Sequence, residues 1–321
     1  MRKILFFLTI LMFLTNLYGE NVQDKLLSFA DENGKGYIKP LVTSFGTNIN
    51  SGLFNTAKVL KPFKFGILFN GTLAFIPSEE KTFVAKRPQL YDASGTPLYE
   101  EEELESATVY GKEGAVFHVN SDLPDEIKNE LKDLKLPNGA SHTTNIPFVP
   151  LVIPQINLGL PYGNEIMFRM MPSFEMSEKI GAISFWGIGL KHSIDQYLPG
   201  IIPIDLAVQT AYQSMKLSDI MTFNNFAANA EISKKLQSLT IYAGLGYENS
   251  KLNAKYESEL TYVNENNDVV TEPLQMDFDV EGDNNFRATF GFRISVLLLK
   301  LYADYSVCKY PVANFGFGLS F

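Results

Sequence analysis

The chain has 321 residues, of which 45% are hydrophobic and 20% are charged, and its formal net charge is −9. This composition excludes a largely disordered protein, because disorder requires low hydrophobicity together with high net charge. The single cysteine, Cys308, excludes an internal disulfide and any zinc site built from cysteines. A mean hydropathy of −0.02 excludes a bundle of membrane-spanning helices. The acidic balance argues against nucleic-acid binding, which depends on Lys and Arg neutralising phosphates.

The first 19 residues have the pattern of a cleaved secretory signal peptide. Arg2 and Lys3 precede an apolar run at residues 4–14, and a short polar stretch ends at Gly19. An uncleaved membrane anchor is the alternative, but the apolar run is shorter than the roughly 20 residues that a helix needs to span a bilayer. We therefore expect export and cleavage.

Residues 20–58 differ in pattern from the rest of the chain. Val22, Leu26 and Phe29 have helical spacing, whereas residues 39–57 are rich in Asn, Gly, Ser and Thr. This pattern predicts a short helix followed by irregular chain. The segment either plugs a barrel from within or forms a periplasmic tail.

Alternation of apolar and polar residues with a period of two dominates residues 59–321 and predicts strands with one apolar face. The candidate strands have about the ten residues that a tilted strand needs to cross a membrane. We predict an all-β fold, a transmembrane antiparallel β-barrel of about 10 strands, or of about 12 to 14 if residues 107–119 and 276–280 add hairpins. A soluble periplasmic β-sandwich is the alternative. The candidate strands lie at residues 62–76, 150–160, 164–176, 181–194, 202–213, 223–232, 238–248, 286–296, 299–307 and 312–321.

The lengths of the predicted connections favour the barrel. The two longest, residues 77–149 and 249–284, fall on the same side of the predicted sheet. Transmembrane barrels have short periplasmic turns and long outer loops. The two long loops contain 14 and 9 acidic residues against 7 and 2 basic ones, so we expect the acidity at the outer surface. The short connections on the other side lie near residues 161–163, 196–201, 233–235 and 297–298.

Pro147, Pro150, Pro154 and Pro161 surround one predicted strand, at residues 150–160. Because proline has no N–H to donate to a sheet ladder, this strand is expected to be broken or bulged. The break is either a lateral exit towards lipid for an apolar solute or simply a loop that enters the wall.

The last predicted strand ends on an aromatic residue. Phe315, Phe317, Leu319 and Phe321 alternate with small or polar residues up to the last position. A terminal aromatic residue that closes an alternating strand resembles the assembly signal of bacterial outer-membrane β-barrels. This resemblance implies localisation in the outer membrane, contact with its lipid and lipopolysaccharide, and recognition of Phe321 by the barrel-assembly machinery.

The order of signal peptide, N-terminal segment and barrel resembles the organisation of the long-chain fatty acid and hydrocarbon transporters of the outer membrane. The Asn-Pro-Ala signature of that family's plug is absent from residues 20–58. A barrel of about ten strands is also smaller than that family's barrel, so no binding residue is carried over. The broader resemblance is to bacterial outer-membrane β-barrels as a class.

Nine charged residues lie on the face opposite to the apolar stripe of their strands, and we predict that they line the lumen. They either line a pore, where charge sets ion preference, or bridge one another and fill a narrow interior. A turn at residues 297–298 would place Arg293 diagonally to Asp304, which predicts an ion pair. The predicted lumen residues are Arg169, Glu175, Lys191, Asp205, Glu231, Arg287, Arg293, Lys300 and Asp304.

The sequence predicts no catalytic, cofactor or metal site. His118, His142 and His192 have no nucleophile elbow or HExxH pattern around them. The acidic run at residues 100–103 lacks the ligand spacing of a calcium loop. We therefore expect no enzyme activity. We expect passive transport of a small solute, for which a hydrophobic molecule is one candidate. A structural or surface-binding outer-membrane barrel without transport is the alternative.

Overall fold

The computed structural model describes residues 20–92, 94–142, 147–177, 181–198, 203–217, 221–263 and 269–321. The predicted signal peptide at residues 1–19 lies outside the described residues. The chain divides into two compact units, a barrel unit (residues 42–76, 147–253 and 281–321) and a loop unit (the described parts of residues 1–41, 77–146 and 254–280). Among the described residues, no helix is both long and apolar enough to cross a membrane.

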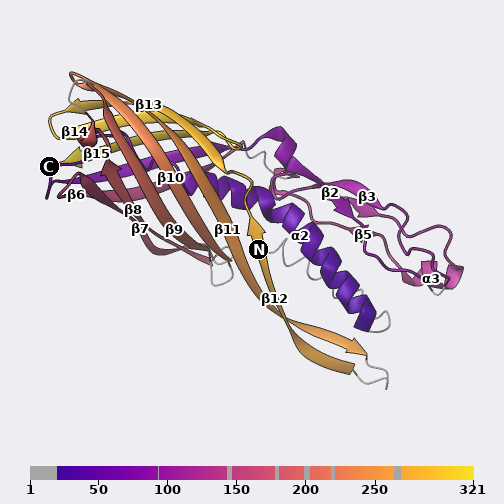
Figure 1. Cartoon of the computed structure of the whole chain (residues 1–321). Coiled ribbons are helices and arrows are strands. Elements are labelled where there is room, and N and C mark those ends of the chain that lie inside the picture. Colours follow the sequence, from indigo (N-terminus) through magenta and orange to yellow (C-terminus); the bar gives the residue numbers. More distant parts are fainter. Residues whose placement is uncertain are drawn as a thin grey trace. The chain divides into compact units, whose positions relative to one another are not determined.

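Ten antiparallel strands close into a barrel, as the alternation predicts (Figure 1). They lie in the order β10-β9-β8-β7-β6-β1-β15-β14-β13-β11, and β10 also pairs with β11, which closes the ring. The strands are β1 (Phe65–Phe75), β6 (Phe148–Leu160), β7 (Asn164–Ser177), β8 (Gly181–Ser193), β9 (Asp205–Leu217), β10 (Met221–Leu236), β11 (Leu239–Val263), β13 (Phe286–Val296), β14 (Leu299–Val307) and β15 (Val312–Ser320). The fold is therefore the predicted all-β transmembrane type of barrel.

The two faces of the wall differ in chemistry. In β15, Phe315, Phe317 and Leu319 are exposed while Asn314 is fully buried. The same alternation in the other strands produces an apolar outer face and a polar inner face, which suits lipid outside and a polar interior. The exposed apolar side chains of the wall include Ile67, Val152, Ile156, Phe168, Trp186, Ile188, Leu190, Phe226, Ile241, Phe290, Phe292, Ile294, Leu301 and Tyr305.

The first and last strands of the barrel meet along an aromatic seam. β1 pairs with β15 in continuous antiparallel register. On the outer face, the rings of Phe65 and Phe321 stack with centroids 4.9 Å apart, and those of Phe69 and Phe317 stack at 5.2 Å. Cross-strand aromatic pairs stabilise a sheet beyond the area that they bury. The terminal aromatic residue thus contributes directly to closing the barrel.

The connections at the two ends of the barrel differ in length. At one end, which we call the turn end, the chain reverses at residues 161–163, 237–238 and 297–298. The turn predicted at residues 233–235 is displaced to 237–238, because β10 continues through Ser233, a buried inner-face residue. The connection between β8 and β9 contains the short helix η3 (Asp195–Tyr197).

The prolines near β6 do not break that strand. β6 pairs with β1 without a register shift from Phe148 to Leu158, so the predicted break or bulge within the strand is wrong. The interruption lies on the other side of β6. There the ladder with β7 runs only from Gln155 to Leu160.

The direction of the backbone groups explains this one-sided interruption. The Ile76 N–H donates to the Pro147 carbonyl at 3.0 Å. Because backbone groups alternate in direction along a strand, odd-numbered residues of β6 face β1 and even-numbered ones face β7. Pro150 and Pro154 therefore lack their N–H on the side of β7, and Pro172 of β7 lacks one in the facing stretch. We call residues 150–154 and 170–174 the open seam.

The helix that precedes the barrel is longer than predicted. α2 spans Glu20–Ile49, whereas the sequence predicts irregular chain from residue 39 onward. Val42 and Ile49 are fully buried in the barrel unit, and this packing overrides the low helix propensity of Asn, Gly, Ser and Thr. The chain then runs without regular structure to Leu60. We call residues 42–60 the plug segment.

The loop unit has a hydrophobic core of its own, formed by Ala85, Leu90, Leu98, Tyr99, Phe117, Leu123, Leu134 and Leu136. Its pairs of short strands are separate from the barrel sheet, so residues 107–119 add no barrel hairpin. Much of the predicted loop at residues 249–284 is instead strand, because β11 pairs with β12 (Val269–Glu281). The remaining elements are η1 (Ser78–Lys81), β2 (Thr82–Lys86), β3 (Glu103–Ala107), β4 (Val116–Phe117), α3 (Asp125–Glu130), β5 (Leu134–Lys135) and η2 (Ala140–His142).

Candidate functional site in the barrel interior

Arginines from the wall cap the end of α2. The last turn of a helix leaves carbonyl groups without partners inside the helix, and no basic residue of α2 lies in its own last turn. Arg169 of β7 donates from Nη1 to the Ile49 carbonyl at 2.7 Å and from Nη2 to the Ser51 carbonyl at 2.8 Å. Arg287 of β13 donates from Nη2 to the Thr47 carbonyl at 2.7 Å. Two cations therefore meet the negative end of the helix dipole.

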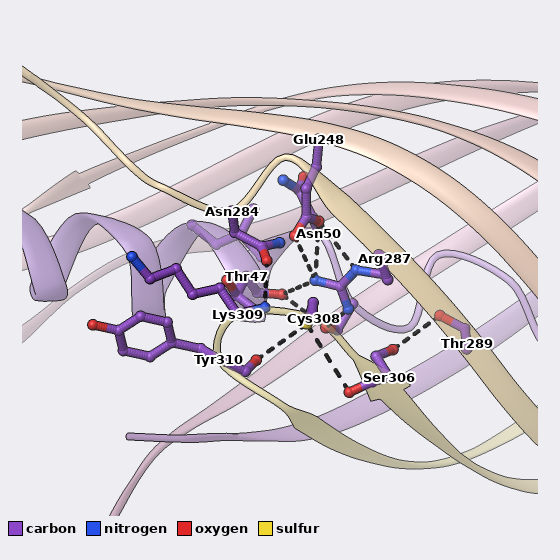
Figure 2. Close-up of polar contacts among 12 residues, drawn as sticks. Thr47, Asn50, Glu248, Asn284, Arg287, Thr289, Ser306, Cys308, Lys309 and Tyr310 are labelled. Atoms are coloured by element: carbon purple, nitrogen blue, oxygen red, sulfur yellow. Dashed lines mark hydrogen bonds and ion pairs between the residues drawn. The ribbon is translucent and has the colours of Figure 1, made fainter. Parts of the chain in front are cut away.

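Arg287 also forms a buried ion pair with the wall (Figure 2). Its Nη2 lies 3.0 Å from Glu248 of β11, and the two side chains are only 4% and 3% exposed. The Ser51 hydroxyl accepts a further hydrogen bond from Arg287, and the Asn50 side chain hydrogen-bonds Glu248. Burying a charge pair is costly unless hydrogen bonds satisfy its remaining atoms. The plug segment supplies these bonds.

A second buried ion pair contacts the plug segment nearer the turn end. Lys191 Nζ lies 2.9 Å from Glu231 and donates to the Thr56 carbonyl at 2.9 Å. The Thr56 hydroxyl is 3.0 Å from the Ser233 hydroxyl of β10, and the Ala57 N–H donates to Ser233 at 3.0 Å. The plug is thus bonded to the wall at the end of α2 and again within its irregular stretch, at residues 56–57.

Amide side chains fill the space between the two ion pairs. Gln213 of β9 donates to the Asn50 side chain at 3.0 Å and accepts from Arg169 at 2.8 Å. Gln155 of β6 donates to the Leu53 carbonyl at 3.3 Å. Beside them lies an apolar cluster of Leu53, Phe54, Met167, Ala211, Ala227 and Tyr242. The interior is therefore a mixed interface between a peptide segment and a polar wall.

Cys308 lies in the connection between β14 and β15, close to Arg287 and Tyr310 (Figure 2). Its thiol donates to the Tyr310 carbonyl at 3.2 Å. Burial raises the pKa of Cys308 to about 11. Because the thiolate is the reactive form of cysteine, this thiol has the environment of a structural residue.

The structure places the nine predicted charged residues in different environments. Glu175 is exposed, because β7 shifts register between Met171 and Phe174 and such a shift turns later side chains to the other face. Lys191, Arg169, Arg287 and Arg293 contact the plug segment. The buried members are Arg169, Lys191, Glu231, Arg287 and Asp304, and the half-buried members are Asp205, Arg293 and Lys300.

The predicted ion pair between Arg293 and Asp304 is not formed. The strand register about residues 297–298 is as predicted. Asp304 instead accepts a hydrogen bond from the Tyr242 hydroxyl at 2.8 Å, and Arg293 donates to the Asn55 side chain of the plug at 2.8 Å. Each of the two side chains therefore bonds a different polar residue instead of the other.

Two acidic residues of the interior are missing from the predicted set. Glu165 accepts from the Leu60 N–H of the plug at 2.8 Å, and its position two strand repeats from Arg169 was a usable signal. Glu248 stands at the last residue of the predicted strand at residues 238–248, beside the predicted loop, so the pattern could not place it. Among the described residues, no group of three or more His, Cys, Asp or Glu side chains could hold a metal ion.

The solved structures to which this chain is similar include three from bacteria. The outer membrane protease OmpT from Escherichia coli is 9% identical, with 83% of this chain and 100% of that chain covered and a TM-score of 0.31. The outer membrane channel DcaP of Acinetobacter baumannii is 10% identical, with 82% and 100% covered and a TM-score of 0.21. The translocator domain of autotransporter NalP from Neisseria meningitidis is 11% identical, with 94% and 99% covered and a TM-score of 0.25.

No curated protein matches the chain. The model of a protein family described as "Family of unknown function (DUF6588)" matches residues 1–321, and the chain belongs to this family.

Proposed function

We propose that the protein is a bacterial outer-membrane barrel through which a small solute passes passively when the plug segment moves aside. One observation carries this proposal. The two buried ion pairs, Arg287 with Glu248 and Lys191 with Glu231, each join residues of the wall, and the plug only adds hydrogen bonds to them. The plug can therefore leave the lumen without leaving any of these four charged side chains unpaired. A plug that was itself one partner of each ion pair could not do so.

The chemistry of the remaining plug contacts supports reversible displacement. The wall binds the plug through carbonyl groups such as those of Ile49, Ser51 and Thr56. Water can replace such hydrogen bonds at a small net cost, on the order of 1 kcal/mol each. An opened lumen would be lined by paired charges, by Arg169 and by amides, all of which water solvates well.

Export and assembly are parts of the same proposal. The predicted signal peptide at residues 1–19 would direct the chain across the inner membrane. The aromatic strand that ends at Phe321 would be recognised by the barrel-assembly machinery, and the apolar outer face would then contact outer-membrane lipid and lipopolysaccharide.

A glycine in α2 offers a direct test of the plug. A Cβ atom on Gly46 would collide with the side chain of Ser250 in β11. Gly46→Leu should therefore prevent the plug from seating and should raise the flux of arabinose into liposomes severalfold. Gly34→Leu is the matched control, because a Cβ atom there meets nothing within 4 Å.

The outcomes separate the possible functions. Raised flux in Gly46→Leu, with Gly34→Leu like the unchanged protein, supports a gated pore. Equal flux in all three proteins would show that the plug is not the gate. A heat-dependent shift in gel mobility verifies in each case that the barrel is folded.

A surface-binding barrel is the second candidate, and the separate core of the loop unit favours it. A connection that only joins two strands needs no hydrophobic core, whereas long ordered loops are commonly functional. No flux in any of the three proteins, together with folded barrels, would favour this candidate.

A further inference from the structure

A cavity of about 270 Å³ opens beside the plug in the barrel unit, near the turn end. Part of its lining comes from the plug, including Phe54, Asn55 and Leu60, and part comes from the wall, including Leu68 and Phe321. Ligand pockets commonly measure roughly 300–1,000 Å³, so this volume suits a small molecule rather than a polymer.

The lining of this cavity is strongly basic. Glu165 is its one side-chain carboxylate, and the Leu60 N–H and the Asn157 side chain already occupy both oxygens of Glu165. Among the cations, Lys191 is paired with Glu231 at 2.9 Å and Lys58 lies 3.9 Å from Asp205. Within the described part of the chain, no carboxylate lies within ion-pair distance of the other four cations, Lys61, Lys64, Arg293 and Lys300.

Arg293 has a hydrogen-bond donor beside this cavity that the described residues leave without an acceptor. Its Nη1 donates to the Asn55 side chain at 2.8 Å. Its Nε is buried and has no hydrogen-bond partner among the described residues. Buried donors are nearly always satisfied by protein, water or ligand, and an arginine fork matches the oxygens of a carboxylate or phosphate. Within the described ranges, Lys300 donates only to the Leu297 carbonyl, at 3.0 Å, so two of its three donors have no partner there.

We infer that this cavity binds a small soluble organic anion through Arg293 and Lys300, with Lys61 and Lys64 attracting it to the turn end. The apolar residues Phe54, Leu60 and Leu68 would contact the uncharged part of the molecule. This inference rests on the proposed transport function in one respect: it identifies the transported solute as an anion. The binding itself does not depend on transport.

Calorimetric titration of the full refolded chain in a zwitterionic detergent tests the site. The probes are gluconate, glucose 6-phosphate and, as an uncharged match, glucose. Both anions should bind and glucose should not. A short-chain phosphatidylglycerol is titrated separately, because a lipid headgroup carries the same anionic oxygens. Binding of this lipid without binding of gluconate or glucose 6-phosphate would overturn the inference.

The variants locate the site. Arg293→Gln with Lys300→Gln should weaken anion binding by about tenfold or more, because each charge-assisted hydrogen bond is stronger than a neutral one. Lys61→Gln with Lys64→Gln changes only exposed side chains and serves if the first variant does not fold; it should weaken binding less. Lys112→Gln with Lys132→Gln removes two exposed cations of the loop unit and should bind as the unchanged protein does. Equal affinity in all variants would overturn the site.

Flux measurements keep this inference distinct from the proposed function. Anion binding without any flux in liposomes would leave the site standing and would contradict transport. Flux of arabinose without anion binding would leave transport standing and would contradict the site. Preference for gluconate over glucose in flux, lost in the Arg293 and Lys300 variant, supports both.

Discussion

At the scale of single residues, the buried pair of Arg287 and Glu248 should be strongly coupled. Removing one partner leaves an unpaired charge in the wall, whereas removing both leaves none. Arg287→Met and Glu248→Gln should each lower the free energy of unfolding. The sum of these two decreases should exceed the decrease in the double variant by about 1–3 kcal/mol. Unfolding of the refolded barrel in guanidinium measures these values.

The exposed pair of Lys128 and Asp125 is the matched control for this cycle. Its nitrogen and oxygen lie 3.0 Å apart, as close as in the buried pair, but the Asp125 side chain is 88% exposed. Solvent screening should bring its coupling energy close to zero. Equal coupling energies for the two pairs would contradict the argument from burial.

A second residue-scale prediction concerns pH in the loop unit. A hydrogen bond and ionic attraction from Glu101 raise the pKa of His118 above its ordinary value of 6.5. Because the folded pKa is raised, the pair stabilises the fold fully below pH 6.5, and this contribution is lost as the pH rises through the folded pKa. NMR titration of histidine-labelled full chain in detergent should show the raised pKa of His118.

Variants of the acidic residues check the cause of that shift. Glu101→Gln should return the pKa of His118 towards its ordinary value. Glu113→Gln, which removes another carboxylate of the loop unit, should leave it raised. A pKa of His118 that does not respond to Glu101→Gln would show that the pair is not formed in solution.

At the scale of elements, the open seam should be the least protected part of the wall. The amides of Val152 and Met170, which face the seam, should exchange with deuterium about tenfold faster than the even-numbered amides of residues 156–160 and 164–168, because a ladder hydrogen bond contributes about 1 kcal/mol. Pro154→Val restores an N–H that faces β7 and should slow exchange across the seam. Pro161→Ala in the turn is the control, and the same exchange in both variants would refute this account of the seam.

At the scale of the whole molecule, the sequence determines the barrel more clearly than its contents. Alternation such as Phe315, Phe317 and Leu319 against Asn314 is decided by two different surroundings, lipid outside and polar groups inside, so it is visible in each strand alone. The ten strands and the turn at residues 297–298 follow from it. The end of β10 beyond Ser233 does not follow from the alternation, because Ser233 faces inward to accept a hydrogen bond from the plug.

The plug contacts are not visible in any local pattern. Residues 42–49 are helical because they are packed within the barrel unit, although their own helix propensity is low. Asp304 chooses Tyr242, which lies 62 residues away in the sequence, over the predicted Arg293. Which of several polar groups a side chain bonds depends on the packing of the whole interior. The odd or even position of a residue in its strand determines only which face of the wall its side chain lies on.

The central claim is that the plug moves aside to open the barrel, and a reversible crosslink tests it most directly. The hydroxyls of Thr56 in the plug and Ser233 in β10 lie 3.0 Å apart, so thiols at these positions can reach the disulfide length of about 2.05 Å after a small adjustment. Thr56→Cys with Ser233→Cys, in a chain that also carries Cys308→Ser, supplies the crosslink. Thr56→Cys with Cys308→Ser is the control.

Flux of arabinose and gluconate into liposomes is then measured with oxidised and with reduced protein. If the plug is the gate, oxidation abolishes flux through the double-cysteine protein, reductant restores it, and neither treatment changes flux through the control. Equal flux through the oxidised and the reduced double-cysteine protein, with the disulfide verified by mass spectrometry, would contradict this claim.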